Sequence, residues 1–136
     1  MILGDSGPVI ALFDQGDREH RSLREFFART REDVQFPSHI VAEVAYMLWR
    51  KAGAAAEVRF LMSVAAGRVS LIHPGAGDYD RAAALVEQYA DFPLGTVDAL
   101  IVAMAERLKV TTILTLDRRH FGAIKPLHCE SFTLVP

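Results

Sequence analysis

Residues 96–121 constrain the fold of this chain more than any other stretch. They read as an apolar helix, a tight connection and a buried β-strand over residues 111–116, with one carboxylate at each end. Asp98 falls in the first helical turn, with Thr96 as the expected N-cap, and Asp117 directly follows the strand. Each acid lies beside sequence that we expect to be buried, where an unpaired charge costs several kcal/mol. Something in the folded protein must therefore compensate these two charges.

Strand-like and helix-like segments alternate through the rest of the chain. We expect a buried first strand at Ile2 and Leu3, and further strands at residues 34–36, 69–72 and, at a sheet edge, 131–135. We expect helices at residues 7–13, 18–31, 38–51, 54–66 and 78–91. Ser38 is the expected N-cap of the third of these, and Gly53 lies near its end. Helical segments of crossover length between strands indicate an α/β fold with a mainly parallel sheet, covered on both faces.

Composition bounds the class of protein. A length of 136 residues suits one domain spanning residues 1–136, and 51% hydrophobic with 24% charged residues is ordinary for a folded protein. The net charge of −2 argues against a strongly basic nucleic-acid binder, although clustered acids can mask a local basic patch. The only cysteine, Cys129, excludes an internal disulfide and fits a reducing compartment. Without a secretory signal or an apolar run of ~20 residues, we expect a cytoplasmic protein with no membrane partner.

Two acids follow predicted strands. Asp5 comes after the first strand, and Asp117 after the strand at residues 111–116. In parallel sheets, ligands bind beyond the carboxyl ends of the strands, where the strand order reverses. Taken singly, each acid has an ordinary alternative: a loop or N-cap acid for Asp5 and Asp117, with Ser6 as an equal candidate for the cap, and a first-turn acid that favours the helix dipole for Asp98.

Glu43 is the fourth acid. In the helix predicted at residues 38–51 we expect it on the buried side, where a glutamate is rare unless it is paired or ligating. Its neighbours on that side are apolar: Ile40, Tyr46 and Met47. The alternative is a buried salt bridge to Arg50 or His39.

Four carboxylates converging on one pocket repel one another, which raises their pKa values and destabilises the site. A divalent cation removes this conflict, and ligands that are all oxygen select a hard ion, Mg²⁺ or Mn²⁺, over zinc. The chemistry such a site favours is hydrolysis of a phosphodiester, because the metal lowers the pKa of a bound water and stabilises charge on the phosphate.

Four motifs then resemble the PIN-domain ribonucleases, and among these the VapC-type toxins of bacterial toxin–antitoxin pairs. They are Asp5-Ser6, the P-S-x-x-x-x-E motif that ends at Glu43, V-D-A-L-I-V-A-M-A around Asp98, and T-L-D-R-R-H-F around Asp117. The resemblance covers essentially the whole chain. One departure is Gly7-Pro8, where the family usually continues with Ser, Asn or a small residue and an aliphatic one.

The resemblance implies a three-layer α/β/α sandwich and Mg²⁺- or Mn²⁺-dependent endoribonuclease activity. It also implies a homodimer and a cognate antitoxin whose tail enters the active-site groove. The family's four metal-coordinating acids match Asp5, Glu43, Asp98 and Asp117. Its supporting hydroxyl positions match Ser6 and Thr115.

Basic residues follow the last acid. We expect Arg118, Arg119 and His120 on an exposed loop, either as contacts to RNA phosphates or as solvated side chains. The arginines of residues 18–31 are expected on a solvated helix face, with RNA contact as the alternative.

Two other functions remain open from the sequence. A phosphoacceptor receiver domain also has an acidic pocket and Mg²⁺, but it needs an acidic neighbour beside Asp5 and a lysine on a late strand end, and Lys125 lies in a Pro-bounded turn. A non-catalytic module with the same fold would only bind RNA or protein. The sequence does not indicate which RNA is the target.

Overall fold

Five short strands form the central sheet of the computed structural model, which describes residues 1–136. They are β1 (Ile2–Gly4), β2 (Val34–Pro37), β3 (Leu71–Ile72), β4 (Thr112–Leu114) and β5 (Thr133–Val135). The spatial order is β3-β2-β1-β4-β5, and every neighbouring pair is parallel. The predicted parallel sheet with its last strand at an edge is therefore confirmed.

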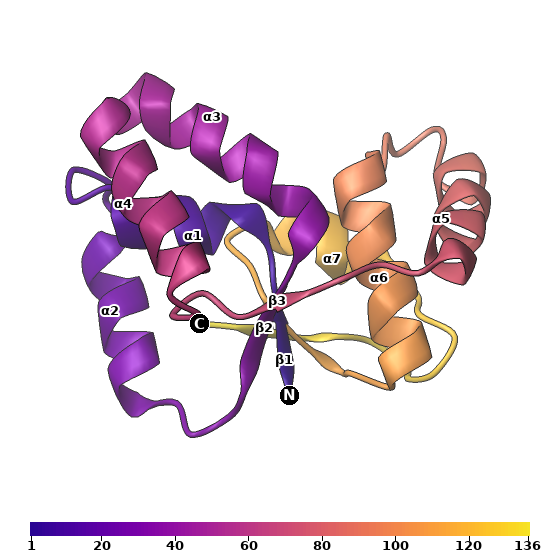
Figure 1. Ribbon diagram of the computed structural model, residues 1–136. Coiled ribbons are helices and arrows are strands. Elements are labelled where there is room, and N and C mark those ends of the chain that lie inside the picture. Colours follow the sequence, from indigo (N-terminus) through magenta and orange to yellow (C-terminus); the bar gives the residue numbers. More distant parts are fainter.

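Helices cover both faces of the sheet, so the fold is an α/β/α sandwich (Figure 1). The first group is α1 (Ser6–Phe13), α2 (His20–Arg29), the 3-10 helix η1 (Ser38–Ile40), α3 (Val41–Ala52) and α4 (Ala54–Ala65). The second group is α5 (Ala76–Gln88), α6 (Thr96–Leu108) and α7 (Arg118–Ala123). In Figure 1 the first group lies on one side of the strands, and α5 and α6 lie on the other. None of the helices is long and apolar enough to cross a bilayer.

Each face of the sheet has its own hydrophobic core, because successive strand residues point to opposite faces. On β1, Ile2 packs among α1, α3 and α4, while Leu3 packs among α5 and α6. On β4, Leu114 lies in the core with Ile2, and Ile113 lies in the core with Leu3. Helix α6 is the most enclosed element, since residues 99–106 are all buried. This enclosure explains why the sequence of α6 is apolar all round.

Two close approaches at the start of the chain position β1 and α1. A Cβ on Gly4 would lie 2.2 Å from Cε1 of Phe36, so only glycine lets β2 pack against this end of β1. Gly7 and Pro8 lie in the first turn of α1, where proline is tolerated because its missing N–H has no helical partner. The departure from the family pattern at these two residues therefore leaves α1 intact.

Three local predictions were wrong. Ser38 does not cap an α-helix: it begins η1, its hydroxyl hydrogen-bonds with Nδ1 of His73 at 2.8 Å, and α3 starts three residues later. Thr96 is the first residue of α6, with Gly95 at the N-cap. The segment after Asp117 is the short helix α7 rather than a loop.

The predicted burial of Glu43 was also wrong. The buried ridge of α3 runs through Ile40, Val44 and Leu48 at a spacing of four residues, and Glu43 lies beside it with its side chain exposed. Tyr46, expected on the same buried side, is exposed as well. Glu43 forms no ion pair, so the alternative of a buried salt bridge is wrong too.

Candidate active site

A cavity of about 860 Å³ opens beside the carboxyl ends of β1 and β4. The chain runs from β1 outward to β2 and β3 and then returns to the other side of β1 as β4, so the strand order reverses between β1 and β4. This is the position at which parallel α/β sheets bind their ligands. All four predicted acids line the cavity: Asp5, Glu43, Asp98 and Asp117.

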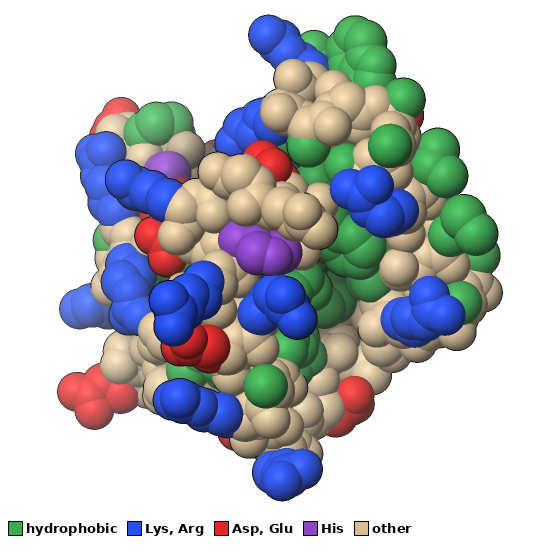
Figure 2. Space-filling view, turned by 90° about the vertical axis from the view of Figure 1, so that its left-hand side faces the viewer, with side chains coloured by type: hydrophobic (Ala, Val, Ile, Leu, Met, Phe, Trp, Pro, Cys, Tyr) green, Lys and Arg blue, Asp and Glu red, His purple; other side chains and the backbone are tan.

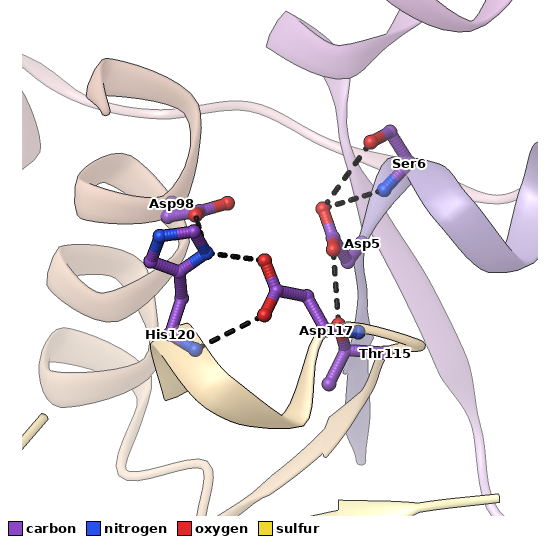
Figure 3. A network of polar contacts seen from close by, with 6 residues as sticks. All are labelled: Asp5, Ser6, Asp98, Thr115, Asp117 and His120. Atoms are coloured by element: carbon purple, nitrogen blue, oxygen red, sulfur yellow. Dashed lines mark hydrogen bonds and ion pairs between the residues drawn. The ribbon is translucent and has the colours of Figure 1, made fainter. Parts of the chain in front are cut away.

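Asp5 is held on both of its carboxylate oxygens. It follows β1 and is the N-cap of α1, so its Oδ1 accepts a hydrogen bond from the Ser6 backbone N–H at 2.7 Å (Figure 3). Its Oδ2 accepts one from the Thr115 hydroxyl at 3.0 Å. Asp5 is only 6% exposed, and this burial raises the pKa of its carboxyl above the ordinary value although both hydrogen bonds lower it. The N-cap alternative for Asp5 and its place in the cavity are thus both observed.

Thr115 connects two of the acids. Its hydroxyl donates to Asp5 and accepts a hydrogen bond from the backbone N–H of Asp117 at 2.9 Å. The threonine is fully buried just after β4, so this link is fixed by the sheet. The second predicted hydroxyl, that of Ser6, lies 3.4 Å from the Asp5 carboxylate.

Asp98 shows the strongest effect of neighbouring charge. It lies in the first turn of α6, as predicted. Burial raises the pKa of its carboxyl, and repulsion from Asp5, Asp117 and Glu43 raises it further, to about 7, against a smaller opposing effect of His120. The exposed Glu43 thus acts on this group through its charge.

Asp117 is the N-cap of α7, and His120 interacts with both oxygens of its carboxylate. Oδ1 accepts a hydrogen bond from the His120 backbone N–H at 3.0 Å, and Oδ2 is in close contact with His120 Nδ1 (Figure 3). Burial acts to raise the pKa of the Asp117 carboxyl, but these hydrogen bonds outweigh it and the pKa is lowered. His120 was expected on an exposed loop, and its inclusion in the acidic cluster was not predicted.

The two arginines of α7 line the cavity, but only one of the two guanidinium groups is hydrogen-bonded to the protein. The Arg118 guanidinium donates to the backbone carbonyls of Leu134 at 3.5 Å and Pro136 at 2.5 Å, which ties it to the end of β5. The Arg119 guanidinium lies 5.8 Å from the centre of the Phe92 ring and makes no hydrogen bond. Arg119 is therefore the cation that is free to meet an anionic ligand.

His39 is a further residue that sequence reasoning did not assign to the site. A carbonyl oxygen only accepts, so Nε2 of His39 donates to the Val97 carbonyl, at 3.1 Å. Burial lowers the pKa of this imidazole. The bond fixes the start of α6, and with it Asp98, against η1. A histidine in the first turn of the helix predicted at residues 38–51 gave no sequence signal for this contact, because its partner is 58 residues away.

The donor set of the cavity fits a hard divalent cation. Several carboxylates gather in it, and burial, together with repulsion between neighbouring carboxylates, raises the pKa values of two of them, Asp5 and Asp98. Positive charge placed among these oxygens relieves the repulsion. Fold and site together define the class: an α/β/α protein with an acidic pocket, suited to a divalent cation, at the switch point of a parallel sheet.

Comparison with known proteins identifies the family. The PIN domain family matches residues 2–125. Ribonuclease VapC26 of Mycobacterium tuberculosis is 34% identical over 132 residues, which cover 97% of this chain and 98% of that protein. The chain therefore belongs to the PIN-domain family, as its motifs suggested.

Solved structures show the same fold. The crystal structure of Mycobacterium tuberculosis VapC20, a Sarcin-Ricin loop cleaving toxin, superposes with a TM-score of 0.84 at 21% identity, covering 96% of this chain and 99% of that one. A toxin-antitoxin complex from Klebsiella pneumoniae gives a TM-score of 0.69 at 22% identity, covering 91% and 92%. At these identities the likeness concerns the fold.

Proposed function

We propose that this protein is a metal-dependent endoribonuclease that hydrolyses RNA phosphodiester bonds and acts as the toxin of a toxin–antitoxin pair. The observation that carries the proposal is the convergence of Asp5, Asp98 and Asp117 on one cavity of a PIN domain. The relative with 34% identity over almost the whole chain is named a ribonuclease, which supports the same activity.

The acids would hold Mg²⁺ or Mn²⁺, with Asp5, Asp98 and Asp117 as the inner group and the exposed Glu43 at the rim. When bound, such a cation supplies positive charge that activates water and stabilises the negative charge developing on the phosphate. Thr115 and Ser6 keep the Asp5 carboxylate oriented through their hydrogen bonds. Arg119, and to a lesser degree Arg118, bind the phosphates that flank the scissile bond.

Partners follow from the same proposal. RNA is the substrate, a cognate antitoxin inhibits the enzyme, and the active form is a homodimer. Several solved structures that share the fold are toxin–antitoxin assemblies, from Klebsiella pneumoniae and Rickettsia felis among others, which supports the antitoxin as a partner. The receiver-domain alternative is not retained, because the chain belongs to another family and Lys125 does not line the cavity.

RNA cleavage by the purified protein tests the proposal. With Mg²⁺ or Mn²⁺ it should cleave structured RNA, and EDTA should stop it. Asp5→Asn and Asp98→Asn should each lower the rate at least ~100-fold, because each removes a charge that the cation needs. Asp80→Asn is the matched control, since Asp80 is exposed on α5 and does not line the cavity. Full cleavage by both site variants would refute the proposal, and a folded protein that binds metal without cleaving RNA would favour the non-catalytic alternative.

A further inference from the structure

The cavity contains a nitrogen ligand atom beside its carboxylates. Nδ1 of His120 contacts Oδ2 of Asp117 and lies 3.9 Å from Oδ2 of Asp98 (Figure 3). One ligand atom from each of these three residues lies within 4.8 Å of the other two. Ligands of a first-row cation lie about 2.0–2.2 Å from it, so two of them are separated by at most about 4.4 Å. The distance of 3.9 Å between Nδ1 of His120 and Oδ2 of Asp98 fits two ligands of one ion, and Nδ1 and Oδ2 of Asp117 would have to move apart to share it.

The orientation of the His120 ring is fixed from two sides. Its backbone N–H donates to Oδ1 of Asp117, which sets the start of the side chain. Its ring packs edge-to-face against Phe92, with the two centres 5.2 Å apart. Phe92 belongs to the connection between α5 and α6, so the imidazole ring of His120 packs between α7 and that connection. Nδ1 thus faces the two carboxylates.

In the metal-free protein a proton fills the space between Nδ1 and Asp117, because a carboxylate oxygen can only accept a hydrogen bond. If His120 ligated a cation held by Asp98 and Asp117, the neutral imidazole would carry its proton on Nε2, and its Nδ1 lone pair would face the ion. The same ring that restrains Asp117 in the metal-free protein is thereby placed to bind the metal.

We propose that His120 is an inner-sphere nitrogen ligand of the cation held by Asp98 and Asp117. The inference rests on the proposed function only for the existence of the metal site. A set of two carboxylates and one imidazole favours Mn²⁺ over Mg²⁺, because Mn²⁺, a transition ion that also binds carboxylates, accepts a nitrogen ligand more readily than Mg²⁺ does. This changes the oxygen-only donor set expected from the sequence and selects Mn²⁺ from the two ions it allowed.

Pulsed electron paramagnetic resonance of the Mn²⁺-loaded protein tests the inference directly. The wild-type protein should show nitrogen modulation of the Mn²⁺ spin echo, and His120→Ala should lose it. His73→Ala is the matched control, because His73 is an exposed histidine that pairs with Ser38 and does not line the cavity. Bound Mn²⁺ without nitrogen modulation in the wild-type protein would overturn the inference.

Calorimetric titration with Mn²⁺ and Mg²⁺ provides a second readout. His120→Ala should weaken Mn²⁺ binding about tenfold or more and Mg²⁺ binding much less. His120→Asp, which restores an oxygen ligand, should bind Mg²⁺ better than His120→Ala does and lower the preference for Mn²⁺. An unchanged ratio of the two affinities in both variants would place His120 outside the coordination sphere.

Neither measurement uses RNA, so the two proposals can fail separately. Nitrogen modulation in a protein that cleaves no RNA would contradict the proposed function and support His120 as a ligand. RNA cleavage by a protein whose Mn²⁺ shows no nitrogen would contradict the inference alone.

Discussion

Burial and the neighbouring carboxylates both disfavour the charged form of Asp98. Its carboxyl has a pKa of about 7 in the folded protein, against an ordinary value of 3.8 in the unfolded chain. The folded state therefore binds a proton more tightly than the unfolded state does. In the metal-free protein, this makes stability fall as the pH rises from about 3.8 to about 7, and the destabilisation is complete above that window.

Asp98→Asn should therefore stabilise the metal-free protein at pH 8. Asparagine keeps the shape of the side chain and removes the repelled charge, so we expect the free energy of unfolding to rise by about 1–3 kcal/mol. At pH 4, where Asp98 is largely protonated, the two proteins should differ little. Urea unfolding at both pH values in EDTA measures this, and Mn²⁺ should stabilise the wild-type protein and not the variant. An equal difference at pH 4 and pH 8 would show that charge is not the cause.

At the scale of elements, two ion pairs lock α5 to α6, the helix that carries Asp98. Arg81 donates to Glu106 at 2.7 and 3.1 Å, and Arg107 donates to Asp78 at 2.8–3.1 Å. In the second pair the two side chains differ in exposure: that of Asp78 is 2% exposed and that of Arg107 is 46% exposed. Removal of one partner therefore has a different cost from removal of the other.

Arg107→Met should destabilise the protein more than Asp78→Asn does. The first change leaves a buried carboxylate without its cation, which costs about 3 kcal/mol or more. The second leaves an arginine that water can solvate, and the asparagine side-chain oxygen can still accept the Gly75 backbone N–H that Asp78 accepts at 2.7 Å, so about 1 kcal/mol is expected. Thermal unfolding of the two variants beside the wild type gives the order, and the reverse order would contradict this account of the pair.

The elements themselves were largely predictable from the sequence. Helix α6 and the strands β1 and β4 carry apolar runs that are buried on all sides, so their patterns are strong, and the strand-following acids Asp5 and Asp117 were found with them. The orientation of Glu43 was not predictable in the same way, because it depends on where the 3-10 turn ends and α3 begins. His120 was predicted as a possible RNA contact, but its place in the acidic cluster was not, because α7 has only six residues, too few for a helical pattern to show.

At the scale of the whole molecule, α3 and α4 present an apolar patch to solvent. The patch consists of Tyr46, Trp49, Val58, Leu61 and Met62, all exposed. Figure 2 shows the side of the molecule that these helices border: hydrophobic side chains gather along one edge, and lysines and arginines are spread over the rest. Exposed apolar patches of this kind mark surfaces that bind other proteins. We expect the proposed homodimer to form through this patch.

Trp49→Lys combined with Met62→Lys should convert the dimer into a monomer, because two charges cannot be buried in an apolar interface without partners. The matched control is Leu127→Lys, since Leu127 is 77% exposed and lies beyond α7, away from α3 and α4. Light scattering after gel filtration measures the mass. One chain supplies all four acids of the cavity, so we expect the monomeric variant to keep its RNA cleavage. A variant that stays dimeric would exclude this patch as the interface, and a monomer without activity would mean that the partner subunit contributes to the site.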